Sequence, residues 1–282
     1  MTGAWGETTP ANRVAVVTGA SAGVGRAIAV AFGSLGWTVA LGARRVERLE
    51  EVAFEVRSAG GTPHVHALDV TDPQSVDTFF DSVEKQAGLA DVLVNNAGVG
   101  YLGAIAEVST ERLRAQIDTN LLGSLYCTRR ATSAMIAAGQ PGDVVFITSD
   151  SVHEAYPHML PYGASKAAIE YVARGLDVEL GGTGIRVSIV RLGPTVSEFN
   201  TNWTDEDMVG FMLAWERLGL GKQDFNYIPV EIAAQAVVTA VTAPPGSKVS
   251  ELSVRPERTI SADEKQRWAD AAAQGRGDDG DD

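Results

Sequence analysis

A tyrosine and a lysine in the second half of the chain are spaced so that they could act on the same proton. Tyr162 and Lys166 are four residues apart, so on a helix both side chains would project from one face. A free tyrosine hydroxyl has a pKa of about 10, too high for an efficient base at neutral pH, and a neighbouring ammonium group favours the phenolate form. Such a pair could protonate a carbonyl oxygen or deprotonate an alcohol. Ser149, 13 residues before Tyr162, could hydrogen-bond the same oxygen.

The residues from Thr18 to Gly25 have the composition of a phosphate-binding loop. They read TGASAGVG, with an apolar run before them and an amphipathic stretch after them. Glycines allow a sharp turn and let a pyrophosphate approach the main-chain amides at a helix N-terminus, where the helix dipole favours anions. A loop that is merely glycine-rich would look the same in isolation. The flanking strand and helix favour a dinucleotide site formed by Gly19, Ser21, Gly23, Val24 and Gly25.

Positioning these groups requires an alternation of strands and helices, and the hydrophobic pattern supplies one. Short apolar, β-branched runs predict strands at 14–17, 38–41, 65–68, 92–94, 144–147, 187–192 and 252–254. Longer amphipathic stretches predict helices at 24–35, 46–59, 73–86, 110–138, 162–180 and 229–242. Right-handed crossovers between such strands give a doubly wound α/β fold of the Rossmann type. We therefore expect a seven-stranded parallel sheet with helices on both faces.

The pattern predicts one domain with an extension at each end. The Rossmann-type α/β domain is expected to span residues 13–258, after a polar N-terminal extension of residues 1–12. Residues 259–282 form a C-terminal tail whose acidic end is expected to be solvated and disordered. Residues 193–227 contain no clear strand, and so long an interruption suggests a lid over a functional site.

Four motifs at successive strand ends resemble those of the short-chain dehydrogenase/reductase family. They are the Gly-x-x-x-Gly-x-Gly loop, Asn95-Asn-Ala-Gly98, Ser149 and Tyr162-Gly-Ala-Ser-Lys166, and the resemblance covers residues 13–255. It implies an NAD(P)-dependent oxidoreductase that interconverts an alcohol and a carbonyl compound, with catalytic residues Asn120, Ser149, Tyr162 and Lys166. It also implies that Lys166 binds the nicotinamide ribose and that Asn120 holds a water connecting the lysine to solvent. The Tyr/Lys pair alone would be an ordinary surface pair, but its occurrence together with Ser149 and Asn120 favours a catalytic role.

The same resemblance implies further cofactor contacts, at Asp69, Val70, Asn96, Ala97, Gly98, Thr195 and Ser197. Asp69 and Val70 match the family's adenine-contacting pair, with Asn96 beside them. Thr195 and Ser197 match positions that contact the nicotinamide carboxamide, although the family's Pro-Gly is Leu192-Gly193 here. In the family this arrangement delivers the pro-S hydride.

The end of the second predicted strand favours NADP(H) over NAD(H). An acidic residue 18 to 20 positions after the glycine loop would bind the adenosine ribose 2′-hydroxyl, but that position is Ala43 and is followed by Arg44 and Arg45. Two guanidinium groups could bind a 2′-phosphate through charge-assisted hydrogen bonds. The two arginines could instead be exposed charges at a helix start, and the basic residue that many NADP-using relatives carry before the middle glycine is Ala22 here.

Composition excludes several other classes of protein. A formal net charge of -13 argues against binding nucleic acid. The single cysteine, Cys127, permits no intrachain disulfide and no cysteine-based metal site, and the scattered His, Asp and Glu residues suggest no metal site. The start of the chain is polar rather than signal-like, and no apolar run is long enough to span a membrane. We therefore expect a cytoplasmic protein.

The predicted lid indicates a substrate class. It carries an apolar and aromatic set at Phe199, Trp203, Met208, Phe211, Met212 and Trp215. A small apolar or aromatic ketone, aldehyde or secondary alcohol would fit such a set, although an ordinary helix-on-sheet or subunit contact would have the same composition. The family resemblance further implies a homodimer or homotetramer formed through the helices predicted at 110–138 and 162–180.

Two other functions remain open from the sequence. A dinucleotide-binding regulator without turnover would keep the glycine loop but would have no need of all four catalytic residues. A serine hydrolase could use Ser149 with His153 or His158, yet no Gly-x-Ser-x-Gly elbow surrounds the serine. The two histidines are more in keeping with polar loop residues near a substrate mouth.

Overall fold

A computed structural model describes residues 12–219 and 226–257 of the chain. Within them a single sheet has the strand order β3-β2-β1-β4-β5-β6-β7, and every neighbouring pair is parallel. The strands are β1 (Val14–Thr18), β2 (Thr38–Ala43), β3 (Thr62–Ala67), β4 (Val92–Asn95), β5 (Gly142–Ser149), β6 (Ile185–Leu192) and β7 (Glu251–Val254). The order reverses direction between β1 and β4, so the predicted doubly wound α/β fold is confirmed.

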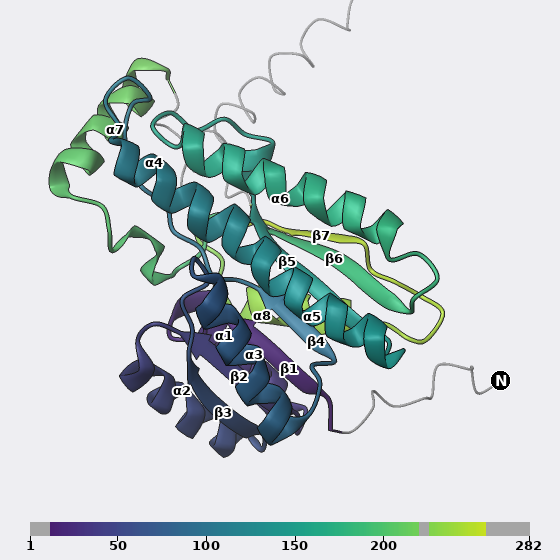
Figure 1. The fold of residues 1–282 in the computed structure, drawn as a ribbon. Coiled ribbons are helices and arrows are strands. Elements are labelled where there is room, and N and C mark those ends of the chain that lie inside the picture. The colour runs from purple at the N-terminus through teal and green to yellow at the C-terminus, as the bar shows by residue number, and fades with distance from the viewer. Residues whose placement is uncertain (1–11, 220–225, 258–282) are drawn as a thin grey trace, which may run out of the picture.

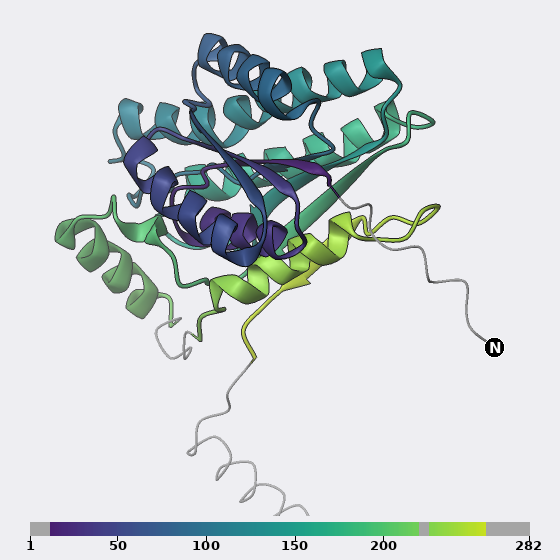
Figure 2. The same cartoon turned by 90° about the horizontal axis from the view of Figure 1, so that it is seen from below.

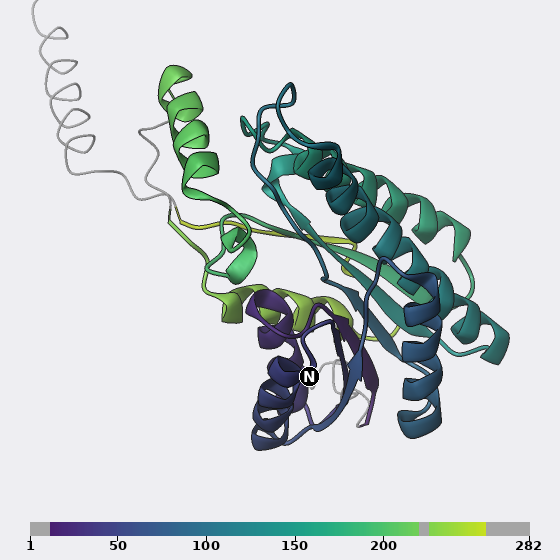
Figure 3. The ribbon, with the colours of Figure 1, turned by 60° about the vertical axis from the view of Figure 1, so that its left-hand side comes forward.

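Helices cover both faces of the sheet (Figures 1 and 2). One layer contains α1 (Gly23–Ser34), α2 (Val46–Ala59) and α8 (Val230–Val241), and the other contains α3 (Pro73–Ala87), α5 (Ser124–Ala138) and α6 (Leu160–Glu179). Two further helices, α4 (Thr110–Ile117) and α7 (Asp205–Arg217), lie toward the carboxyl ends of the strands. Figure 3 shows α7 standing apart from both layers.

The interior strand β1 shows why four apolar residues follow one another in its sequence before Thr18. All five of its residues are buried. Because successive side chains of a strand point to opposite faces, Ala15 and Val17 pack with the α1, α2 and α8 layer, while Val14 and Val16 pack with the other layer. A strand covered on both faces is apolar wherever no hydrogen bond satisfies a polar side chain, and such a nearly continuous apolar run in the sequence indicates a parallel sheet.

Most predicted elements agree with the structure to within about two residues at each end, and two of them differ more. β3 begins at Thr62 rather than at residue 65, since Thr62 pairs with Thr38 and Pro63 is tolerated in an edge strand. The helix predicted at 110–138 is interrupted, because a π-helical turn at Asp118–Gly123 separates α4 from α5.

The predicted lid region contains a helix that the sequence analysis missed. α7 begins with a capping box, in which the Thr204 hydroxyl accepts from the Asp207 N–H while the Asp207 carboxylate accepts from the Thr204 N–H. The pattern Thr-x-x-Asp is a local signal that could have revealed it.

Several sequence predictions fall outside the described residues. They concern the N-terminal extension before Asn12 and the C-terminal tail. Within the described residues, no helix has the combination of length and apolar character needed to cross a membrane.

Candidate active site

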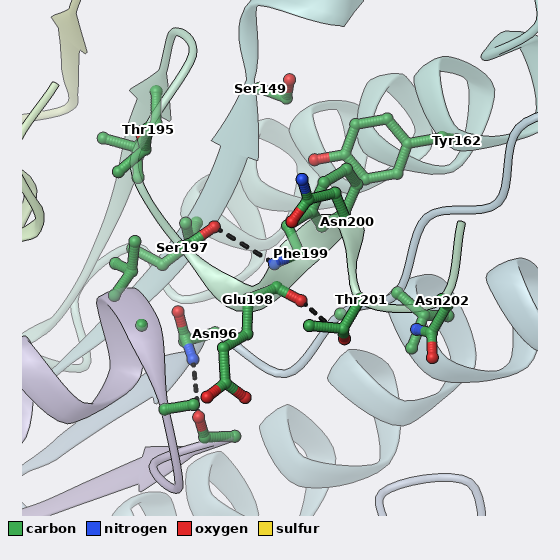
Figure 4. Close-up of a pocket in the computed structure, with 18 of the residues that line it drawn as sticks. Asn96, Ser149, Tyr162, Thr195, Ser197, Glu198, Phe199, Asn200, Thr201 and Asn202 are labelled. Atoms are coloured by element: carbon green, nitrogen blue, oxygen red, sulfur yellow. Dashed lines mark hydrogen bonds between the residues drawn. The ribbon is translucent and has the colours of Figure 1, made fainter. Parts of the chain in front are cut away.

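A cavity of about 900 Å³ lies at the carboxyl ends of the strands. Its walls come from the glycine loop after β1, from the ends of β2, β4, β5 and β6, and from residues of the predicted lid. Ligands of doubly wound sheets bind at this edge, where the strand order reverses. In Figure 4, Ser149 and Tyr162 lie at one end of the view, with Asn96 and Glu198 toward the other.

The glycine loop is held by its neighbours in a shape that leaves its main chain accessible. Gly19 and Gly23 have φ angles of +65° and +54°, which side-chain-bearing residues rarely adopt. A Cβ at Gly25 would collide with Asn96 Nδ2 and with the Gly19 carbonyl oxygen. Ala22 at the N-terminus of α1 makes no side-chain capping hydrogen bond, so the first N–H groups of the helix lack a side-chain partner there. These features fit the pyrophosphate of a dinucleotide.

Asn96 and Thr18 hold this loop in place through hydrogen bonds with main-chain groups. Asn96 Nδ2 donates to the main-chain oxygens of Thr18 (2.9 Å) and Gly19 (3.3 Å). The Thr18 hydroxyl accepts from the N–H groups of Asn96 and Ala97, both at 3.0 Å, and donates to Val94 O. The side chain of Asn96 is therefore used within the protein, as a support of the glycine loop.

Asn120 lies in the π-helical turn behind the cavity and is 1% exposed. Its side-chain amide donates to Val99 O and Ser165 Oγ, both at 2.9 Å, and accepts from Val99 N at 2.8 Å. The Asn120 carbonyl accepts from Ser124 Oγ at 2.8 Å, and a carbonyl oxygen has a second lone pair. Both N–H donors of the side-chain amide are therefore used, so a water held by Asn120 would have to donate a hydrogen bond to one of its two carbonyl oxygens, and the main-chain oxygen is one of them.

Tyr162 and Ser149 meet at the end of the cavity that is built by β5 and α6. Ser149 is the last residue of β5, and its Oγ accepts from Ser151 N at 3.2 Å. Tyr162 lies in the first turn of α6 and is 8% exposed. Burial raises the pKa of Tyr162 to about 12, while a hydrogen bond with Ser149 acts in the opposite direction. In this environment the hydroxyl is a weak acid that holds its proton.

Lys166 stands one helical turn from Tyr162 and is also buried. Its Nζ donates to Ile147 O at 2.9 Å and lies 5.9 Å from the centroid of the Tyr162 ring. Burial lowers the pKa of Lys166 to about 8. The sequence argument expected the ammonium group to favour the phenolate, but the pKa of Tyr162 is set by burial and by Ser149 in this structure, and that of Lys166 by burial.

Gly98 lies beside the same two groups. A Cβ at this glycine would be 3.3 Å from Asn120 Oδ1 and 3.4 Å from Lys166 Nζ. The loop after β4 thus passes closely between the asparagine and the lysine.

The opposite end of the cavity is basic. Arg44 and Arg45 follow β2 and line the cavity. Arg45 Nη2 donates to Ser21 Oγ at 3.1 Å, and its Nη1 pairs with Glu198 Oε2 at 3.1 Å. Arg48, on α2, donates to both Glu198 oxygens, at 2.6 and 2.7 Å. Within the described residues Arg44 forms no salt bridge.

Asp69, at the end of β3, also lines this end of the cavity. Burial would raise the pKa of its carboxyl group, but hydrogen bonds from Thr71 and the charge of Arg44 lower the pKa overall. Asp69 is therefore an anionic acceptor at neutral pH.

The lid residues close the cavity with an aromatic wall. Ring centroids of consecutive members lie 4.9 to 6.4 Å apart, in the order Tyr162, Phe199, Trp203, Phe211, Trp215 and Tyr156. Trp203 Nε1 donates to Gly100 O at 3.0 Å. Figure 4 shows Phe199 lying next to Tyr162. All six apolar and aromatic residues that the sequence singled out in the lid line the cavity.

The comparison with known proteins agrees with this geometry. A profile of the family described as short chain dehydrogenase matches residues 13–208. The chain belongs to the short-chain dehydrogenase/reductase family. Proteins of this family are oxidoreductases that use NAD or NADP.

Individual members of the short-chain dehydrogenase/reductase family are similar over different lengths. A glycine betaine reductase of Emericella nidulans is 34% identical over 197 residues, which are 70% of this chain but 15% of that protein. An uncharacterized oxidoreductase of Staphylococcus saprophyticus is 32% identical over 248 residues, 87% of this chain and 97% of the relative. The structure of an alcohol dehydrogenase from the archaeon Thermococcus sibiricus, complexed with 5-hydroxy-NADP, is 30% identical with a TM-score of 0.73. The match covers 88% of this chain and 99% of that chain.

The residues predicted for a short-chain dehydrogenase site are largely brought together. Every predicted cofactor residue lines the cavity, as do Ser149, Tyr162 and Lys166. Asn120 does not line it, although the preceding residue, Thr119, does.

The histidines considered for a hydrolase lie elsewhere. Neither His153 nor His158 lines the main cavity, and His158 instead borders a second cavity of about 480 Å³ beside α7. The interpretation of both as polar loop residues near a substrate mouth stays a prediction, and Ser149 has no histidine partner for nucleophilic catalysis. In the described parts of the chain, no group of three or more His, Cys, Asp or Glu residues could hold a metal ion.

Three residues at the site were missed by sequence reasoning. Thr18 begins the glycine motif, and its bracing hydroxyl could have been suspected from that position. Arg48 lies in the first turn of α2, three residues after the N-cap residue Arg45, and its closeness to the two predicted arginines could have suggested it. Glu198 had no local signal, because its partners are about 150 residues away in the sequence.

Proposed function

We propose that this protein is an NADP(H)-dependent oxidoreductase that interconverts a secondary alcohol and a ketone or aldehyde. One observation carries the proposal: Ser149, Tyr162 and Lys166 line the same cavity as the glycine loop and the arginines after β2. The main cofactor contacts would come from Gly19, Ser21, Gly23, Val24, Gly25, Arg44, Arg45, Asp69, Val70, Asn96, Ala97, Gly98, Tyr162, Lys166, Thr195 and Ser197.

The proposed chemistry assigns a proton to Tyr162. The bound nicotinamide supplies or accepts the hydride. Tyr162 gives its hydroxyl proton to the carbonyl oxygen during reduction and takes it from the alcohol during oxidation. Because burial raises the pKa of Tyr162 to about 12, the hydroxyl is protonated at neutral pH. It can therefore donate its proton when the carbonyl compound is reduced. The charges of Lys166 and of an oxidised nicotinamide would lower that pKa for the reverse direction.

The other catalytic residues orient these groups. Ser149 would donate a hydrogen bond to the substrate oxygen and hold the carbonyl carbon toward the hydride. Lys166 would bind the nicotinamide ribose, and the main-chain oxygen of Asn120 would hold a water that connects the lysine to solvent. In the family this arrangement uses the pro-S hydride, and we propose the same here.

The preference for NADP(H) rests on charge. Ala43 is buried and offers no carboxylate to repel a 2′-phosphate, while Arg44 and Arg45 line the cavity. A guanidinium group binds a phosphate through forked, charge-assisted hydrogen bonds. The relative from Thermococcus sibiricus, which was solved with 5-hydroxy-NADP, supports the same choice.

The proposed substrate is a small apolar or aromatic carbonyl compound or alcohol. Phe199, Trp203, Phe211 and Trp215 form a continuous wall beside Tyr162. Such walls bind substrates mainly by burying apolar surface. The substrate would therefore place its oxygen at Ser149 and Tyr162 and its apolar part against the lid.

We further propose that the domain of residues 13–258 works in the cytoplasm as a homodimer or homotetramer. α6 exposes Tyr171 (77%) and Val178 (80%), and α5 exposes Ile136 (51%). Large apolar side chains on two adjacent helices support an interface there.

A substrate panel tests the proposed reaction. Apolar, aromatic and charged carbonyl compounds are mixed with the protein and NADPH or NADH, the corresponding alcohols are mixed with NADP or NAD, and the absorbance of the reduced nicotinamide is followed. Consumption of NADPH with an apolar or aromatic member, and its loss in Ser149→Ala, is the expected result. Cofactor binding without turnover of any carbonyl compound or alcohol would favour the regulatory alternative.

A further inference from the structure

The turn that follows the end of β6 reaches across the cavity to the arginines after β2. It includes Ser197, Glu198 and Phe199, which come after Gly193–Val196, and Ser197 packs on the glycine loop. A Cβ at Gly23 would lie 3.1 Å from the Ser197 Cβ. The next residue, Glu198, places its carboxylate between Arg45 and Arg48. In Figure 4 this carboxylate points away from Ser149 and Tyr162.

The carboxylate uses donors that a 2′-phosphate would need. Glu198 receives three hydrogen bonds from two guanidinium groups, at 2.6, 2.7 and 3.1 Å. Arg45 also lines the cavity and donates to Ser21 Oγ, whereas Arg44 forms no salt bridge in the described residues. Of the two arginines that would bind the phosphate, Arg45 is thus already paired with a carboxylate.

From this arrangement we infer that Glu198 determines the strength of the discrimination between NADP(H) and NAD(H) by competing with the 2′-phosphate for Arg45. The inference rests on the proposed NADP(H) preference. If the phosphate displaces Glu198, the protein loses an ion pair on binding. If Arg45 holds both anions, two negative charges stand close together and repel each other. Both arrangements weaken NADP(H) binding and leave NAD(H), which lacks the phosphate, nearly unaffected.

The expected size of the effect follows from exposure. The side chains of Arg45, Arg48 and Glu198 are 48%, 45% and 43% exposed. Each exposed ion pair contributes modestly, so Glu198→Gln should tighten NADPH binding about three- to tenfold. The affinity for NADH should change less than about twofold. The difference should shrink at high ionic strength, because salt screens exposed charges.

The test compares the unmodified protein, Glu198→Gln and Asp205→Asn in fluorescence titrations with NADPH and NADH. Asp205 stands at the start of α7, so Asp205→Asn removes the same charge from the same lid and serves as the control. Titrations with adenosine 2′-monophosphate and adenosine 5′-monophosphate measure the phosphate site without the nicotinamide. We expect Glu198→Gln to tighten NADPH and the 2′-monophosphate alone, and Asp205→Asn to affect all four ligands equally.

Two outcomes would overturn the inference and can be told apart. If the unmodified protein prefers NADPH but Glu198→Gln weakens or does not change its binding, Glu198 is not a competitor and the inference alone fails. If the unmodified protein binds NADH as tightly as NADPH, the proposed cofactor preference fails, and the inference fails with it.

Discussion

The two ends of the cavity are held in place by different kinds of contact. At the glycine-loop end, Thr18 and Asn96 hydrogen-bond main-chain groups, and the positive φ angles of Gly19 and Gly23 set the path of the chain. At the lid end, the wall consists of aromatic side chains. The ion pair of Arg112 with Asp207, at 2.8 and 3.1 Å, also helps to hold the lid there.

This difference separates the binding of the cofactor from the recognition of the substrate. A pyrophosphate is recognised by main-chain amides, so the loop that binds it needs particular residues at fixed positions. An apolar substrate is recognised by shape and buried area, and many side chains can provide both. The proposed function therefore predicts that changes at one end of the cavity alter cofactor affinity and that changes at the other alter turnover or substrate affinity.

The largest expected effect is a loss of turnover in Tyr162→Phe. Removing the proton donor should lower kcat by about 10²- to 10⁴-fold, the usual contribution of general acid/base catalysis, while the Kd for NADPH stays within a few-fold. Steady-state kinetics and fluorescence titration of one preparation measure both quantities. Retention of more than about a tenth of the wild-type kcat would remove Tyr162 from the proposed role.

A pH-dependent change in stability is expected from Lys166. Burial lowers its pKa from 10.5 to about 8 in the folded protein, so between these values the unfolded chain binds more protons. The destabilisation from burying the charge is fully present below about pH 8 and disappears as the pH rises to about 10.5. The free energy of unfolding of wild type should therefore rise relative to that of Lys166→Met over this interval.

The size of this change is about 3 kcal/mol at most, from the size of the pKa shift. Denaturant unfolding of both proteins at several pH values measures it. A parallel pH dependence of the two proteins would show that Lys166 is not desolvated in the folded state.

A weaker preference for NADPH is expected from substitutions at the arginine end of the cavity. Ala43→Asp with Arg44→Ala removes a phosphate partner and adds a carboxylate that accepts from a 2′-hydroxyl and repels a 2′-phosphate. Since a charged hydrogen bond contributes about 1.5 to 3 kcal/mol, the ratio of NADPH to NADH affinity should fall at least about tenfold. Titration with both cofactors checks this, and an unchanged ratio would show that Arg44 does not contact the phosphate.

The smallest effect is expected at the lid. Arg112→Gln breaks the pair with Asp207, whose members are 32% and 13% exposed, and should raise the KM for the carbonyl substrate a few-fold with an unchanged Kd for NADPH. The stability loss should be about 1 kcal/mol or less. Lys248→Gln, which breaks a pair with Asp177 on exposed segments outside the cavity lining, is the matched control. An equal rise in KM in the control would mean that the lid pair has no specific role.

Most of the fold could be predicted because a parallel sheet buries both faces of its strands. β1 and α2 had nearly the predicted bounds, since a run of five buried residues and a regular amphipathic pattern are local properties. The start of β3 could not be predicted, because it depends on pairing with β2 across an edge. The π-helical turn at Asp118–Gly123 does not change the spacing of apolar residues in a way that distinguishes it from an α-helix. The interruption of the predicted helix was therefore missed.

The candidate site also has a part that local sequence patterns predict and a part that they do not. The positions of Gly19, Ser149, Tyr162 and Lys166 follow from motifs at strand ends, and the cavity brings them together. The partners of Glu198 and the bracing role of Asn96 depend on contacts between distant segments, which no local pattern contains.

The transfer of deuterium from labelled NADPH tests the proposed function most directly. NADPH carrying deuterium at the pro-S or at the pro-R position is used with a carbonyl compound that the substrate panel identifies, and the product alcohol is examined by mass spectrometry. The account predicts deuterium on the product carbon from the pro-S cofactor and none from the pro-R cofactor. Label from the pro-R cofactor, or product without label from either, would contradict hydride transfer from a nicotinamide held as proposed in this cavity.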